Sequence, residues 1–140
     1  EAQSLLLRAI TDFELANDTA RQATALGLRA RIHLAQGELA EAAPVLDDAL
    51  RLAWPSRDIA ACAAILDAMA EASAKSGDMQ RARLLMCASN QLRMKSGIKR
   101  MPVYATQLAA LNSELFRDGL DDSLSPDAII EREIQRGLRR

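Results

Sequence analysis

Apolar residues recur along most of the chain at intervals of three and four residues, a spacing that gathers them on one face of an α-helix. The pattern is clearest over residues 19–36 and 57–76, where one stripe of apolar or small side chains is bordered by polar ones. These inward stripes consist of Leu26, Ala30, His33 and Leu34 in the first segment and Leu66, Met69, Ala70 and Ser73 in the second. Each segment is therefore predicted to be a helix with one buried face.

The chain repeats itself with a period of 40 residues. The segment GELAEA at 37–42 recurs as GDMQRA at 77–82, and the apolar positions that follow coincide in the same register. This alignment yields three copies of one helix, at about 1–16, 39–53 and 79–95, and each of the last two follows one of the helices described above. Glycine accepts a positive φ after one helix, and an acidic residue favours the start of the next. The unit is thus predicted to be an antiparallel helical hairpin, which buries its apolar face by stacking on its neighbours.

The small residues in this register resemble those of the tetratricopeptide repeat. The residues that carry the resemblance are Gly37, Ala42, Leu46 and Ala49 in one unit and Gly77, Ala82, Met86 and Ser89 in the next. The period of 40 exceeds the usual one of about 34 residues, and the proline that usually closes the unit has no counterpart in register. The resemblance implies an all-α fold of tetratricopeptide-like antiparallel hairpins stacked in a right-handed solenoid.

Longer segments are similar to the long-period repeats of large bacterial signal-transduction ATPases of the STAND type. The similar segments are EAAPVLDDAL at 41–50, RDIA at 57–60 and SGDMQRARLL at 76–85, and the tail from ASNQLR at 88–93 to SLSPDA at 123–128 is similar to the end of such arrays. These regulators often end in a LuxR-type DNA-binding domain or are fused to a cyclase. The resemblance implies a cytoplasmic domain that binds a protein, a peptide or a small-molecule inducer, and that can also form a homo-oligomer.

Residues beyond 95 leave the 40-residue register. Helices are predicted over 103–117 and 126–138, the second with Ser125 as N-cap and Pro126 at its first position. An irregular closing pair is typical of a solenoid cap, so the chain is expected to be the C-terminal end of a longer array. The predicted organisation is one helical-repeat domain over 1–140, made of an orphan helix at 1–16, a repeat at 19–54, a repeat at 57–95 and capping helices at 102–140.

The composition favours helices and excludes several classes of function. Alanine (27) and leucine (21) are strong helix formers, whereas the aromatic residues that strands favour number four. Eighteen basic and 19 acidic residues leave a net charge of −1, so no overall electrostatic field attracts nucleic acid or an anionic membrane. No apolar run approaches the ~20 residues of a spanning helix. Cys62 and Cys87 are too few for a disulfide framework, and a reducing, cytoplasmic setting with buried thiols is expected.

Residues suited to catalysis or metal binding do not cluster in the sequence. His33 is the only histidine and lacks partners at the spacing of a metal site, so a packing position with one hydrogen bond is predicted. There is no Ser-His-Asp grouping, glycine-rich phosphate loop or HExxH motif. We therefore expect no catalytic residue, no cofactor and no metal site, and no enzyme activity.

A polar strip is the leading candidate for partner binding. In a tetratricopeptide-like array the first helix of each hairpin lines the concave side, and the alignment places Arg31, Asp67, Glu71 and Lys75 there. One interpretation is that this strip contacts a peptide or ligand. The other is that Arg31 pairs with Glu71 and Glu71 with Lys75 inside the fold, each pair contributing about 0.3–0.5 kcal/mol if exposed.

Two further functions remain open from the sequence. The domain could be a stand-alone adaptor that binds a peptide in its groove. It could also contact nucleic acid through the C-terminal arginines and a basic cluster of Arg93, Lys95, Lys99 and Arg100. Because no aromatic residues are interleaved and no helix-turn-helix pattern is present, a solvated face is the simpler interpretation of these charges, and nucleic acid is not expected to bind.

Overall fold

The structure, a computed structural model, describes the backbone of residues 1–15, 18–117 and 124–139, and these ranges contain seven α-helices and no β-strand. The helices are α1 (Ala2–Leu15), α2 (Thr19–Ala35), α3 (Leu39–Ala53), α4 (Ile59–Lys75), α5 (Met79–Ser96), α6 (Pro102–Leu115) and α7 (Pro126–Leu138). The predicted all-α fold is confirmed, and each helix begins and ends close to its predicted limits. Within the described ranges, no helix has both the length and the apolar character needed to cross a membrane.

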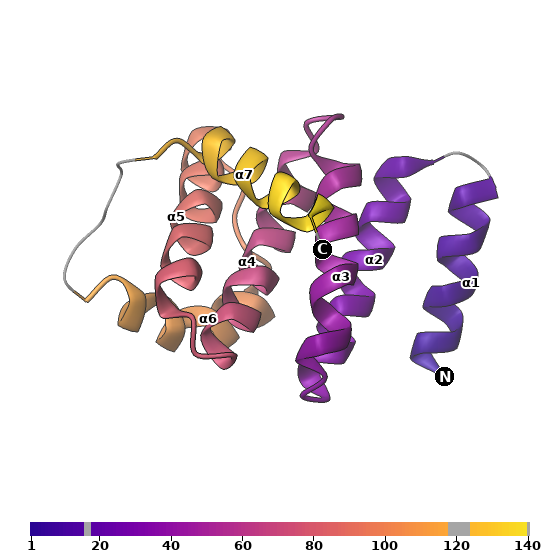
Figure 1. Cartoon of the computed structure of the whole chain (residues 1–140), viewed down its shortest axis with the longest axis horizontal. Helices are drawn as coiled ribbons and strands as arrows, with labels where there is room; N and C mark the ends of the chain where they lie inside the picture. The colour runs from indigo at the N-terminus through magenta and orange to yellow at the C-terminus, as the bar shows by residue number, and fades with distance from the viewer. Residues whose placement is uncertain (16–17, 118–123, 140) are drawn as a thin grey trace.

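Helices α2 and α3 form one antiparallel hairpin, and α4 and α5 form the next (Figure 1). The hairpins lie side by side through contacts between α3 and α4, and α1 packs against α2 at the N-terminal end of the row. Equivalent helices start 40 residues apart, because α2 and α4 begin at residues 19 and 59 and α3 and α5 at 39 and 79. The period in the sequence is therefore the length of one hairpin.

The connections after α2, α3, α4 and α5 all contain a residue in the left-handed region of backbone space. Gly37, Gly77 and Gly97 have φ angles of 75°, 91° and 74°, and Arg57 has a φ of 55°. In the turns after α2, α3 and α4, the amide of the residue that follows the left-handed one donates to a carbonyl five residues earlier, at 2.8–3.4 Å, which closes the preceding helix. The turn positions 37, 57, 77 and 97 reveal a half-period of one helix plus its turn.

Side chains cap the starts of several helices. The side chains that accept a hydrogen bond from a first-turn amide, at 3.1–3.2 Å, are those of Asp18, Asp58, Asp78 and Ser125. Ser125 is the N-cap predicted for the last helix. Glu38, which precedes α3, makes no such bond, and its carboxylate lies 3.3 Å from His33 instead.

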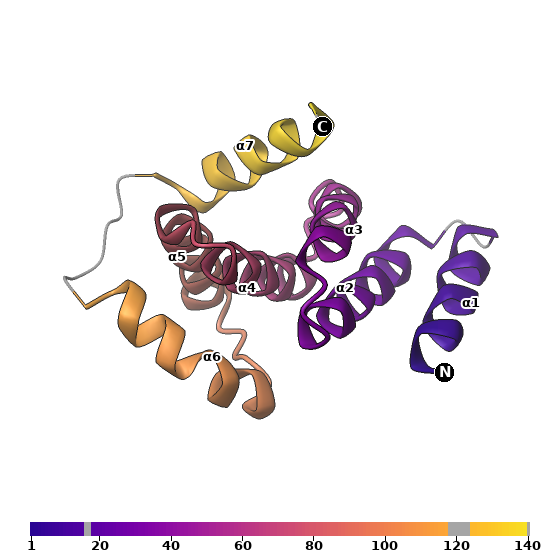
Figure 2. The same ribbon diagram turned by 60° about the horizontal axis from the view of Figure 1, so that its bottom comes forward.

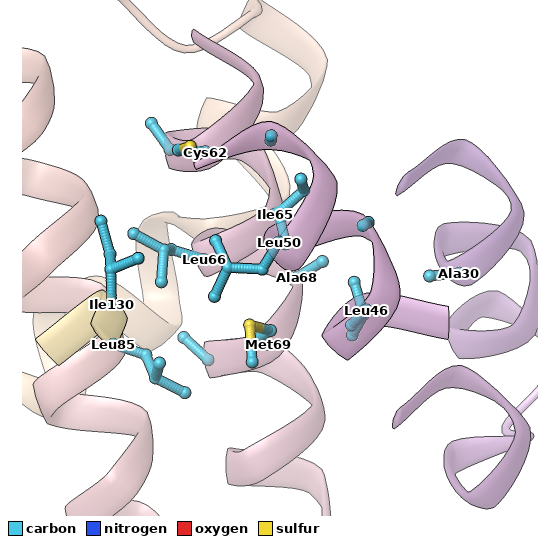
Figure 3. Close-up of a cluster of buried hydrophobic side chains, with 14 of the residues drawn as sticks. Ala30, Leu46, Leu50, Cys62, Ile65, Leu66, Ala68, Met69, Leu85 and Ile130 are labelled. Atoms are coloured by element: carbon cyan, nitrogen blue, oxygen red, sulfur yellow. The ribbon is translucent and has the colours of Figure 1, made fainter. Parts of the chain in front are cut away.

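One core joins both hairpins and the C-terminal helix (Figure 3). Its largest fully buried apolar side chains are Leu46, Leu50, Leu66, Met69, Leu85, Met86 and Ile130, which come from α3, α4, α5 and α7. Burying a side chain of this kind contributes about 1.5–3 kcal/mol relative to leaving it exposed. Fully buried alanines such as Ala30 and Ala70 let the helix axes approach closely.

The two C-terminal helices lie on opposite sides of the α4–α5 hairpin (Figure 2). Helix α7 crosses α5 and α3, and its buried Glu133 accepts a hydrogen bond of 2.6 Å from Arg81. Helix α6 buries Leu108, which lines a hollow beside α4, and Leu115, whose carbonyl accepts a hydrogen bond from Arg83 of α5. The closing helices thus take different roles: α7 covers the core, and α6 forms one wall of a groove.

Candidate functional site

Three of the four residues in the predicted polar strip meet at the surface. Arg31 on α2 lies 3.9 Å from Glu71 on α4, and Lys75 lies 3.3 Å from the other oxygen of the same carboxylate. The Arg31 side chain is 14% exposed, that of Glu71 25% and that of Lys75 46%. The structure therefore contains both ion pairs of the packing interpretation, while partner contact by these residues stays a prediction.

The fourth residue of the strip, Asp67, does not lie at the surface. Its side chain is 1% exposed, so its expected position on an open groove wall is wrong. Arg93 donates to one carboxylate oxygen at 2.8 Å, and Arg100 donates to both oxygens at 2.8 and 2.9 Å. The Ser89 hydroxyl also donates to Asp67. Both oxygens are occupied, and the carboxylate joins α4 to α5 and to the segment that leads into α6.

These contacts divide the predicted basic cluster. The side chains of Arg93 and Arg100 turn inward and are 11% and 14% exposed, whereas Lys95 and Lys99 face solvent. Burial lowers the pKa of the Arg93 guanidinium, and the Asp67 carboxylate opposes this shift. Arg93 and Arg100 of the basic cluster therefore form ion pairs inside the fold.

Tyr104 on α6 is a site residue that the sequence analysis did not identify. Its ring lies over Arg31, with 4.0 Å between the guanidinium carbon and the ring centroid. Arg31 also donates to the carbonyl of Ala64 on α4 at 3.4 Å. Tyr104 is the only tyrosine of the chain, but its local pattern does not reveal that α6 turns back over α2. The stacking joins a repeat helix to a helix outside the repeat register.

A groove is lined by residues of α2, α4 and α6. We call it the central groove and define it by Arg31, Glu71, Lys75, Tyr104 and Gln107. It consists of two hollows of about 690 and 410 Å³ that share Glu71 and Gln107. Apolar side chains of α1, α2 and α6 line most of the remaining surface. An apolar surface with a few placed polar groups is the usual character of a binding site.

His33 and Cys62 are structural residues. His33 is 8% exposed, and its Nδ1 lies 3.3 Å from the Glu38 carboxylate, in keeping with the predicted packing position. Cys62 is fully buried, and burial together with the Asp58 carboxylate raises the pKa of its thiol to about 12. A thiol with this pKa stays protonated at neutral pH and is a poor nucleophile. The part of the chain that the structure describes holds no group of three or more His, Cys, Asp or Glu residues suited to a metal ion.

Comparisons of the chain with protein-family models, with curated proteins and with solved structures find no match. The function must therefore be argued from the residues of this chain and their geometry.

Proposed function

We propose that the chain is a protein-interaction and ligand-sensing domain of a multidomain bacterial signalling or transcriptional regulator, and that it acts by binding and scaffolding. In this proposal the hairpins are tetratricopeptide-like repeats of a right-handed solenoid in a cytoplasmic STAND-type protein, with a LuxR-type or cyclase domain elsewhere in that protein. The similar segments at 41–50 and 76–85 support this assignment, as does the 40-residue spacing of equivalent helices.

The central groove is the observation that carries the proposal. Its larger hollow combines the apolar side chains of Leu28 and Ile32 with the polar groups of Arg31, Glu71 and Gln107. Its volume of about 690 Å³ falls in the range of roughly 300–1,000 Å³ that is usual for ligand sites. A protein, a peptide or a small-molecule inducer would each find both apolar surface and charged partners there.

The geometry also suggests how binding would be transmitted. A ligand changes a distant domain only by favouring one arrangement of the protein over another. The Arg31–Glu71 pair spans the two hairpins at 3.9 Å, and Tyr104 joins α6 to the same arginine. A ligand that competes for Arg31 would therefore alter the contacts between α2, α4 and α6 together.

Selection of peptides from a random displayed library tests the binding function. Peptides that bind the wild-type chain should lose at least about tenfold in affinity for Glu71→Lys, because the reversed charge would face Arg31 and Lys75. Glu41→Lys is the matched control, since Glu41 is exposed on α3 away from the groove and should change little. A library without enriched peptides, or peptides that bind both variants equally, would contradict the proposal.

The complete reading frame that encodes the chain tests the regulator context. An ATPase domain with a nucleotide-binding loop upstream of these residues would support the STAND assignment. A frame without such a loop would favour the alternative, a stand-alone adaptor that uses the same groove for a peptide.

Nucleic-acid contact is the remaining alternative, and the structure gives it less support. Arg93 and Arg100 bind Asp67, which leaves Lys95 and Lys99 as the exposed residues of that cluster. Titration with random duplex DNA at several salt concentrations tests it. A dissociation constant tighter than about 10⁻⁶ M at physiological salt would revive this function.

A further inference from the structure

A third hollow lies beside the central groove, between α2 and α4. We call it the α2–α4 slot. Its volume is about 160 Å³, and small or apolar side chains such as Ala61 and Ala64 line most of it. It shares Leu28, Arg31 and Tyr104 with the larger hollow of the central groove. An apolar cavity of about this size accommodates one aromatic ring.

Gly27 contributes to the slot from the interior of α2. A Cβ atom at this position would meet only the Cγ1 atom of Ile65 at 3.7 Å, which is an ordinary van der Waals contact. The packing of the protein therefore does not require glycine here, although glycine in a helix interior lowers stability relative to alanine. The missing side chain leaves space in the slot and exposes the backbone of α2 to whatever enters it.

Arg31, which also lines the slot, has weak partners for a guanidinium with five donors. Its hydrogen bond to the Ala64 carbonyl is long, at 3.4 Å, and its ion pair with Glu71 spans 3.9 Å. Its side chain is 14% exposed, and Arg31 is not among the residues with a buried side-chain nitrogen that lacks a partner, so its remaining donors are open to water or to a ligand.

The charges around Arg31 favour an anion. The repulsion from Arg31 and Arg100 contributes to the lowered pKa of Arg93, behind the larger effect of burial, so these three cations lie close enough to interact. Asp67 and Glu71 are the carboxylates that pair with these arginines, and Lys75 also pairs with Glu71, so four cations stand against two carboxylates. A planar guanidinium with free donors matches the two oxygens of a carboxylate.

We propose that the α2–α4 slot and Arg31 form a binding site for a carboxylic acid that carries an apolar group about the size of an aromatic ring. The apolar group enters the slot beside Gly27, and the carboxylate accepts hydrogen bonds from Arg31. Tyr104 and Met101, at the start of α6, form the outer wall. This inference rests on the proposed function, since it names the chemistry of the ligand at one end of the central groove.

Nuclear magnetic resonance titration of the full chain tests the site with 3-phenylpropionate as the probe. We expect the backbone amide signals of Gly27, Arg31 and Tyr104 to shift, with a dissociation constant near the millimolar values usual for a probe of this size. The neutral amide 3-phenylpropanamide should bind at least about tenfold more weakly, because it cannot form a charge-assisted pair with the guanidinium.

Two variants locate the site on the protein. Arg31→Leu removes the cation, and Gly27→Leu fills the slot, so each should weaken the binding of 3-phenylpropionate by at least about tenfold. Arg21→Leu is the control on the same helix, because the Arg21 side chain is 74% exposed and does not line the slot. If a variant does not fold, the comparison of acid and amide on the wild type still decides the question. Equal binding of acid and amide, or shifts confined to Leu6 and Gln107, would overturn the proposal.

A second pair of probes separates the two sources of such an acid. The tripeptide Gly-Gly-Phe with a free C-terminal carboxylate represents a peptide end, and the same tripeptide with a C-terminal amide is its control. Binding of the free tripeptide with the same shifts indicates that peptide ends are recognised, whereas binding of 3-phenylpropionate alone indicates a small-molecule ligand. Either result supports the site.

The failure of this inference can be told apart from failure of the proposed function. If displayed peptides bind wild type and lose affinity for Glu71→Lys while neither acid binds the slot, the groove function stands and the ligand chemistry is wrong. If 3-phenylpropionate alone binds and no groove-dependent peptide is found, the small-molecule site stands and the protein-interaction function is wrong.

Discussion

Replacing Asp67 by asparagine tests the charge network that joins this carboxylate to Arg93 and Arg100. The substitution keeps the shape of the side chain and removes its charge. Asp67 accepts hydrogen bonds from Arg93 and Arg100 at 2.8–2.9 Å, and it is the only carboxylate that pairs with either arginine among the described ion pairs. Asp67→Asn would leave two inward-turned guanidinium groups without their counter-charge.

The size of the effect follows from burial. Removing one partner of a fully buried ion pair costs about 3–5 kcal/mol, because the other charge stays behind unpaired. Asp67 is 1% exposed, but Arg93 and Arg100 are 11% and 14% exposed and can reach some water. We therefore take the lower end and expect a loss of about 3 kcal/mol, which lowers the melting temperature by roughly 10 °C in a domain of this size.

Urea denaturation followed by circular dichroism measures this loss, and two other variants calibrate it. Asp48→Asn makes the same chemical change in an exposed pair, since Asp48 and Arg51 are 2.9 Å apart but 52% and 50% exposed. It should cost less than about 0.5 kcal/mol. Arg100→Met removes one cation but leaves Asp67 bound to Arg93, so its cost should fall between the other two.

The order of the three variants decides whether the reasoning holds. If Asp67→Asn costs no more than Asp48→Asn, the two arginines are adequately solvated without their carboxylate, and the network does not fix the start of α6. If Arg100→Met costs more than Asp67→Asn, the arginine contributes through packing against its neighbours rather than through the ion pair.

Three further predictions concern single positions. The pKa of the Cys62 thiol is raised from about 9 to about 12, so above pH 9 the folded state keeps a proton that the unfolded chain loses. The stability that Cys62 contributes is intact below pH ~9 and is lost as the pH rises toward 12, so the advantage of wild type over Cys62→Ala should shrink by about 1.4 kcal/mol per pH unit above pH 9. Urea unfolding at several pH values measures this difference, and a constant difference would contradict the prediction. Gly27→Ala should raise stability by about 0.5–1 kcal/mol, whereas Gly137→Ala should lower it, because its Cβ would meet Asp47 at 3.1 Å; thermal melts of both variants check the signs. Arg57→Gly should melt within a few degrees of wild type, since relief of the positive φ offsets the lost stacking on an indole 3.7 Å away. Arg57→Ala keeps the strained φ and loses the stacking, so it should melt lower.

The sequence predicts the helices well because their ends are chemically marked. Glycine at 37, 77 and 97 and aspartate at 58 and 78 provide left-handed turns that end α2, α4 and α5 and side-chain caps that start α4 and α5. The half-period is harder to see in the sequence, because Arg57 occupies the left-handed position where the pattern elsewhere has glycine. Its guanidinium stacks on Trp54 and donates to the Trp54 carbonyl at 2.9 Å, which compensates for the strained backbone.

The candidate site is only partly predictable, for a physical reason. Arg31, Glu71 and Lys75 lie in the repeat register, so the alignment alone brings their helices together. Asp67 is bound by Arg100, and Tyr104 belongs to α6, and both Arg100 and α6 lie outside the repeat register. The hydrophobic pattern of α6 predicts a helix, but it does not specify which side of the α4–α5 hairpin the helix covers.

The contacts of α6 link the two hairpins mechanically. Arg100 fixes the segment before α6 to α4 through Asp67, and four residues later Tyr104 stacks on Arg31 of α2. A change in the spacing of α2 and α4 must therefore break the stacking or move the start of α6. Because Arg31 lines both the slot and the central groove, a ligand in either hollow acts on the same contact. Ligand binding would therefore move the first turn of α6. In this turn Tyr104 is partly buried, whereas the other side chains are exposed.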